Sequence, residues 1–230
     1  MPVAAGGGWR LGERADDVPG AGDATSAAEK GTLHAGERDT PRVRALRGQF
    51  RWQIAAVNPK KLVFVDESGV NTSMTRTRGR AAPGERVAGA VPQAHWTTLM
   101  MLGALGLDGV AAAATVDAAT DTDVFDTFVR QVLVPALRAG DVVVWDNLSP
   151  HKAAQVEPEL ARARATLMCL PPYSPDFSPI KPCWSKVKRH MRDVEPRTPE
   201  ALGRAAAEGF SSVTDDDARG WFEHCGCCVH

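Results

Sequence analysis

The sequence predicts an α/β fold in which helices flank a mixed five-stranded sheet. Two observations lead to this fold class. Three segments with strand character come early and are spaced so that they can pair as antiparallel neighbours, whereas two later strands alternate with helices. Paired strands followed by alternating helices and strands are typical of a mixed sheet covered by helices.

The composition is that of a globular protein without a membrane segment. The 230 residues are 43% hydrophobic and 24% charged, which excludes disorder along the whole chain. The 27 basic residues are balanced by 28 acidic ones, so a nucleic acid would be bound by a local basic patch rather than by the net charge. No apolar run approaches the roughly 18 residues of a membrane-spanning helix. The five cysteines form no disulfide framework, and we expect a cytoplasmic protein.

The first 60 residues divide into two segments. Residues 1–32 are rich in Gly, Ala and Asp and show no apolar period, so we expect a flexible leader. Residues 33–60 contain an amphipathic connecting helix, because apolar side chains recur at spacings of three and four from Val43 to Val57, with Pro41 near the first turn. Several arginines of this helix fall mostly off the apolar stripe, which favours a solvated face over a nucleic-acid contact. They are Arg42, Arg44, Arg47 and Arg51.

Residues 61–230 carry the remaining elements as a single domain. The apolar runs KLVFVD and DVVVWD predict buried strands, and the segment GLDG predicts a hairpin connection. The strands that we expect are 61–66, 95–105, 109–116, 141–146 and 166–170. The helices that we expect are 121–137, 149–164, 180–192, 198–209 and 214–223. A fixed loop rich in proline, PPYSPDFSPIK, precedes the third of these helices.

Two of the predicted strands end in an aspartate, Asp66 in VFVDES and Asp146 in VVWDN. A charge at the end of an apolar strand is costly unless it is compensated, and a divalent cation is one way to compensate it. Mg²⁺ prefers oxygen ligands and needs only one or two carboxylates together with a substrate phosphate. Each aspartate could equally cap the turn that follows its strand. The two aspartates alone leave both interpretations open.

Three motifs, in order along the chain, resemble the bacterial insertion-sequence branch of the mariner superfamily of transposases. They are VDESG at 65–69, WDNLSPHK at 145–152 and LPPYSPDFSPIKPCWSKVK at 170–188. The resemblance implies a ribonuclease-H-like catalytic core with an Asp-Asp-Glu or Asp-Asp-Asp triad, which acts on DNA phosphodiester bonds with Mg²⁺ or Mn²⁺. It makes Asp66 and Asp146 the first two catalytic and metal-binding acids. The third acid aligns with position 181, which is a lysine here.

Lys181 does not replace a metal-binding carboxylate. Its ammonium only donates hydrogen bonds, and it would repel a nearby unit positive charge by roughly 4 kcal/mol at about 4 Å and an effective dielectric of about 20. We therefore expect Lys181 to pair with Asp66 or Asp146 and the transposase domain to be catalytically impaired. Asp176 could reach a metal instead, although its place in the loop motif favours a role in ordering the loop. A non-catalytic DNA-binding or regulatory remnant is the alternative function, and a structure-specific nuclease is a third.

Basic side chains near the motifs are the candidate DNA contacts. Lys186, Lys188 and Arg189 follow Lys181 on one predicted helix, and such a cluster suits a phosphate backbone. Lys152 follows the second acid at a helix start, where it could contact phosphate or only solvent. Related transposases carry N-terminal helix-turn-helix modules that read the major groove. None is recognisable here, so the resemblance implies an N-terminally truncated transposase. Its partners would be DNA and, in a homodimer or a mixed assembly, a second copy or an intact transposase.

Overall fold

The computed structural model describes residues 35–76, 78–92, 96–117, 122–146 and 150–227. The chain divides into two units, 1–33 and 34–230, and every described residue belongs to the second unit. The leader that the sequence predicts lies outside the described residues. No helix in the described part of the chain is long and apolar enough to cross a membrane.

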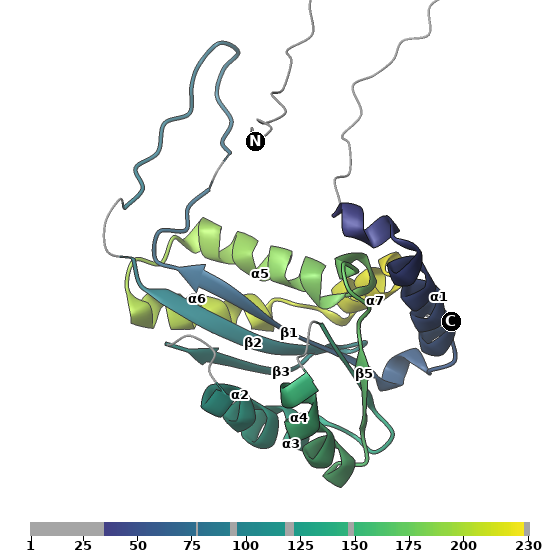
Figure 1. The fold of residues 1–230 in the computed structure, drawn as a ribbon. Helices are drawn as coiled ribbons and strands as arrows, with labels where there is room; N and C mark the ends of the chain where they lie inside the picture. Colours follow the sequence, from purple (N-terminus) through teal and green to yellow (C-terminus); the bar gives the residue numbers. More distant parts are fainter. Residues whose placement is uncertain (1–34, 77, 93–95, 118–121, 147–149, 228–230) are drawn as a thin grey trace, which may run out of the picture. The chain divides into compact units, whose positions relative to one another are not determined.

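A mixed five-stranded sheet forms the centre of the fold, in the order β3-β2-β1-β4-β5 (Figure 1). β1 pairs antiparallel with β2, and β2 pairs antiparallel with β3. On its other side β1 runs parallel to β4, and β4 runs parallel to β5. The predicted mixed sheet is therefore confirmed, and the strands that lead to the two aspartates are neighbours. The strands are β1 Leu62–Asn71, β2 Thr98–Gly106, β3 Gly109–Val116, β4 Val142–Trp145 and β5 Thr166–Cys169.

Helices cover both faces of this sheet (Figure 1). One face carries α1 Pro41–Ala55, α5 Ile180–Val194, α6 Pro199–Ser211 and α7 Asp215–His224, and the other carries α2 Thr122–Phe128, α3 Val134–Ala136 and α4 Pro150–Arg162. The helix expected at 121–137 contains a π-helical stretch, η3 Val129–Leu133, between α2 and α3. Short 3-10 turns complete the fold at η1 Gly36–Asp39, η2 Pro59–Lys61 and η4 Pro175–Phe177.

The two faces of the sheet belong to two separate apolar clusters, because successive side chains of a strand point in opposite directions. On β1, Phe64 packs with α1, α5, α6 and α7, whereas Val63 and Val65 pack with α2, η3 and α4. Phe64 meets Phe222 of α7 edge to face, with 5.4 Å between ring centroids. Asp66 follows Phe64 by two residues, so its side chain lies on the face that α5 covers.

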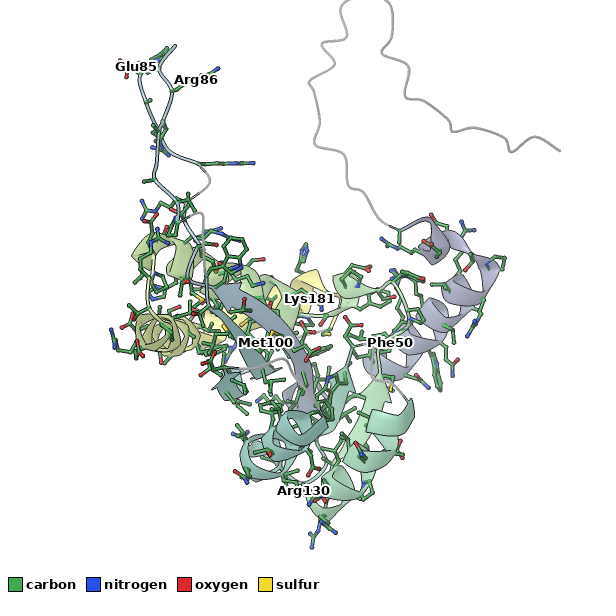
Figure 2. The ribbon with its side chains drawn as sticks, turned by 60° about the vertical axis from the view of Figure 1, so that its left-hand side comes forward. Phe50, Glu85, Arg86, Met100, Arg130 and Lys181 are labelled. Carbon is green, nitrogen blue, oxygen red and sulfur yellow. The ribbon has the colours of Figure 1, made fainter. Side chains whose placement is uncertain are left out.

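The extent of β1 corrects one prediction. The strand expected at 61–66 continues to Asn71, because β2 goes on pairing with it from Asp66↔Gly103 to Asn71↔Thr98. Asp66 therefore lies within the strand and is only 8% exposed, rather than emerging at its end. Only the pairing with β4 stops there, at Val65↔Trp145. Beyond β1 the chain extends away from the sheet before it returns as β2, with Glu85 and Arg86 at the tip of this segment (Figure 2).

The helix α1 corrects a second prediction. Thr40 caps it and Pro41 occupies its first turn, as the sequence indicates. Arg47, however, is not on a solvated face, because it is only 7% exposed. Its guanidinium donates to Asp176 at 3.0 and 2.6 Å and lies 4.1 Å from the ring centroid of Phe177. This contact ties α1 to the loop that leads into α5.

Candidate active site

Asp66 and Asp146 start from adjacent backbone positions. Val65 of β1 is the register partner of Trp145 of β4 in a parallel pair, so the residue that follows each of them lies at the same level of the sheet. Asp146 comes directly after the end of β4, which agrees with the predicted strand end. The two strands thus bring together the two acids that the sequence singled out.

Lys181, in the first turn of α5, joins the two acids. Its Nζ lies 2.9 Å from Oδ2 of Asp66 and 3.1 Å from Oδ2 of Asp146. Because both oxygens contact the same nitrogen, they are no farther apart than the sum of these distances. Burial alone would lower the pKa of Lys181, but the charges and hydrogen bonds of the two acids raise it above its usual value. The ammonium is therefore charged, and the predicted pairing is confirmed with both acids.

Trp184 is a site residue that the sequence interpretation missed. It is 5% exposed and packs in the core, as is usual for tryptophan. Its indole N–H also donates to Oδ2 of Asp66 at 2.7 Å. It stands three residues after Lys181, and this spacing puts both side chains on one face of α5. That spacing within the third motif is the signal that could have identified it.

Asp176 does not join the two acids. Arg47 binds it through both guanidinium NH groups, and Arg38 adds a contact at 3.3 Å. Burial alone would raise its pKa, but these arginines lower the pKa of Asp176 below its usual value. The Asp176 carboxylate is thus bound by arginines of α1 and η1, which supports the interpretation that Asp176 orders the loop.

A groove of about 730 Å³ opens beside Asp66 and Lys181, between β1 and α5. Its acidic side chains are Asp66, Glu67 and Asp193. Asp193 is already paired, because Arg76 donates to it at 2.6 Å. Cations are twice as numerous as acids, which makes the groove basic in a chain with no overall positive charge. The basic side chains are Arg76, Arg78, Lys181, Lys188, Arg189 and Arg192.

The four candidate DNA contacts fall into different surroundings. Lys188 and Arg189 line the groove with Lys181. Burial and the positive charges of Arg192 and Lys181 lower the pKa of Lys188, although Asp66 acts in the opposite direction. Lys186 instead pairs with Asp217 of α7 and lines a neighbouring pocket, which shares Ser185, Arg189 and Asp193 with the groove. The side chain of Lys152 lies outside the described residues, although its backbone is part of α4.

The donor set does not fit a divalent metal. Among the residues that the structure describes, no three His, Cys, Asp or Glu side chains gather as metal ligands. Asp66 and Asp146 supply oxygens of the kind that Mg²⁺ prefers, but a charged ammonium bridges them. A dication at the same place would be repelled by that ammonium and would have to displace it.

Comparison with known families assigns the chain to one of them. Residues 61–202, more than half of the chain, match the family described as DDE superfamily endonuclease. The chain belongs to this family. Asp66, Asp146 and Lys181 all lie within the matched segment of this DDE superfamily endonuclease. A comparison with curated protein sequences finds no match.

Solved transposase structures share the fold. The Mos1 transposase paired-end complex with left transposon end superposes with a TM-score of 0.69 at 16% identity, over 87% of this chain and 64% of that chain. The Mos1 mariner paired end complex with Mn gives 0.69 at 15% identity, over the same shares. The catalytic domain of Mos1 mariner transposase gives 0.56 at 13% identity, over 84% of this chain and 91% of that chain. The chain therefore has the fold of that catalytic domain and spans just under two-thirds of the longer Mos1 chains.

Proposed function

We propose that this DDE superfamily endonuclease is a DNA transposase domain whose cleavage and transfer of DNA strands are impaired by Lys181. The observation that carries the proposal is the bridge from the Lys181 ammonium to Asp66 and Asp146. In a triad of acids, position 181 would supply a third oxygen ligand. Here it supplies a cation that only donates hydrogen bonds. The proposed domain is 61–230, with 33–60 as its connecting helix.

DNA is the proposed partner of the basic groove. Lys188, Arg189 and Arg192 of α5 line this groove and make no ion pair with any described residue, so they suit the phosphates of a backbone. Mos1 structures with this fold are described as a paired-end complex with left transposon end and as a strand transfer complex, which supports DNA as the ligand here. The motifs at 65–69, 145–152 and 170–188 further support an origin in a bacterial type of insertion sequence. The proposed location is the cytoplasm.

Magnesium or manganese is the metal expected from the family, because Mos1 complexes are described with each of them. When bound in such a site, the metal activates an attacking oxygen and stabilises a leaving one. In this chain Asp66 and Asp146 are the residues that could contribute ligands, and Lys181 opposes them. This opposition is the reason that we propose impaired catalysis.

The same bridge favours a second candidate function, a non-catalytic DNA-binding or regulatory remnant. A domain that keeps a basic groove and has no working triad could occupy DNA without cutting it. It could also enter a homodimer or a mixed assembly with an intact transposase. Cleavage by such an assembly would fall as the proportion of this chain rises, which a titration of this chain into an active mariner-type transposase would measure.

A combined binding and nicking assay tests the proposal. Wild-type protein is mixed with supercoiled plasmid and with a fluorescent duplex, in Mg²⁺ or Mn²⁺. We expect binding that weakens steeply between low and high salt, with no nicking above background. A double substitution, Lys188→Glu with Arg189→Glu, should weaken binding. Arg138→Glu is the matched control, since Arg138 is 75% exposed and lines a different pocket. Nicking by the wild type would refute the impairment, and no binding would refute the DNA partner.

A further inference from the structure

The charges in the groove depend on Lys181 more than on any other single side chain. Asp66 lines the groove and Asp146 lies beside it, and among the described residues Lys181 is the cation that pairs with both acids. Arg76, which also lines the groove, is engaged by Asp193 instead. Without the Lys181 ammonium, two adjacent carboxylates would face any phosphate that entered the groove.

The position of Lys181 is fixed by its own partial burial and by the contact of Trp184 with Asp66. Its side chain is 34% exposed, so it is half-buried beside the sheet while its ammonium faces the groove. Trp184, one turn further along α5, donates to the same Asp66 oxygen that Lys181 contacts. The carboxylate is therefore fixed by the indole as well as by the ammonium, and the lysine meets a pre-positioned partner rather than a mobile one.

We propose that Lys181 is a built-in counter-ion, which neutralises Asp66 and Asp146 so that the groove binds the DNA backbone without any divalent metal. The proposal rests on the proposed function, because it takes DNA as the ligand. It goes beyond that function in assigning a positive role to the lysine. The lysine then not only prevents cleavage but also keeps the groove ready to bind phosphate.

Charge arithmetic along the groove supports this role. With lysine at position 181, six basic side chains line the groove together with Asp66, Glu67 and Asp193, and Asp146 lies beside the groove in contact with the Lys181 ammonium. With glutamate there, the groove would be lined by five cations and four carboxylates, and the glutamate would form one cluster with Asp66 and the adjacent Asp146. Phosphate would be repelled from that cluster unless a cation entered it. The substitution should therefore convert metal-independent binding into metal-dependent binding.

The decisive experiment measures duplex DNA affinity by fluorescence anisotropy at constant ionic strength, in EDTA and in Mn²⁺. The proteins are wild type, Lys181→Glu, Lys181→Met and the control Arg138→Glu. Wild-type affinity should be the same in EDTA or slightly higher, since free Mn²⁺ competes for phosphate. Lys181→Glu should bind on the order of tenfold more weakly in EDTA and recover when Mn²⁺ is added. The expected signature is that Mn²⁺ strengthens DNA binding by Lys181→Glu but not by wild type.

The other outcomes separate the two proposals. Wild-type protein that binds DNA only with Mn²⁺ would overturn the counter-ion role but leave DNA as the partner. Lys181→Glu binding as tightly as wild type in EDTA would do the same. Wild-type protein that binds no DNA in either buffer would overturn both. Lys181→Met removes the charge without adding an acid, so if Lys181→Glu fails to fold, a drop in Lys181→Met affinity in EDTA supports the role and unchanged affinity refutes it.

Discussion

Trp184 donates its indole N–H to Oδ2 of Asp66 across 2.7 Å, and this contact depends on a glycine in the neighbouring strand. Gly103 is the cross-strand partner of Asp66. A Cβ atom at Gly103 would lie 2.8 Å from Cη2 of Trp184, which is closer than non-bonded carbons approach. The absence of a side chain at Gly103 therefore lets the indole reach the acid.

Gly103→Ala should destabilise the domain. The added methyl must push aside a rigid ring that the core encloses, and overpacking of this kind costs about 1–3 kcal/mol. Urea unfolding followed by circular dichroism measures the change. Gly203→Ala is the control, because Gly203 lies in α6 with nothing within 4 Å of an added Cβ. This substitution should stabilise the domain by about 0.5–1 kcal/mol. Equal effects at the two glycines would show that Trp184 does not pack as described.

Arg47→Leu should loosen α1 from the domain. The substitution removes both hydrogen bonds to Asp176 and the bond of 2.6 Å to Ser174, which together hold the loop before α5. A lost bond to a charged partner costs about 1.5–3 kcal/mol. Thermal unfolding measures the loss. Arg44→Leu provides the comparison on the same helix, because Arg44 is 68% exposed and lies 3.8 Å from Asp39, so its change should stay within about 0.5 kcal/mol.

Asp217 should make the domain sensitive to acid. The hydrogen bond from Lys186 and the capping bonds at Thr214 lower the pKa of Asp217 from 3.8 to about 2. A lowered pKa means that this stabilisation is complete above 3.8 and is lost as the pH falls toward about 2. Asp217→Asn should therefore be less stable than wild type at neutral pH, with a smaller further loss on acidification.

Urea unfolding at a series of pH values tests the sign of this effect. Asp216→Asn is a suitable control, because Asp216 is an exposed neighbour in the same first turn of α7. If Asp217→Asn loses as much stability as wild type between neutral pH and pH 2, the Lys186–Asp217 pair contributes nothing in the folded state.

The elements that sequence patterns predicted well are those whose burial is continuous. The apolar runs of β1 and β4 gave the two parallel central strands, and the position of Asp146 at the end of β4 followed directly. The second half of β1, residues 67–71, carries no apolar run and is held by its pairing with β2. The prediction from the local sequence pattern therefore ended this strand too early. The full length of such a strand can be predicted only when the strand that pairs with it is known.

Long-range pairing also explains the residues that the sequence interpretation missed. Arg47 looks like a surface residue on its helix, and its partner Asp176 is 129 positions away in the chain. Trp184 looks like a core residue and is one, but its N–H meets a strand residue 118 positions earlier. By contrast, the pairing of Lys181 was predictable, because the family resemblance aligned this cation with the third acid position, beside two carboxylates whose charges required a partner.

Lys181→Glu should let the domain bind a divalent cation that the wild type excludes. The substitution exchanges a bridging ammonium for an oxygen ligand beside Asp66 and Asp146, and Mg²⁺ and Mn²⁺ both accept carboxylate oxygen. Titration calorimetry with Mn²⁺ should show affinity tighter by on the order of tenfold or more than for wild type.

In that calorimetric comparison, Lys181→Met separates the effect of removing the positive charge from the effect of adding an oxygen ligand. It removes the repulsion of the ammonium without adding a ligand, so its Mn²⁺ affinity should fall between those of wild type and Lys181→Glu. An affinity equal to that of Lys181→Glu would mean that repulsion alone excludes the metal. Wild-type protein that already binds Mn²⁺ as tightly as Lys181→Glu would mean that the ammonium swings away from Asp66 and Asp146 when metal arrives. The assignment of Lys181 as the obstacle to catalysis would then be wrong.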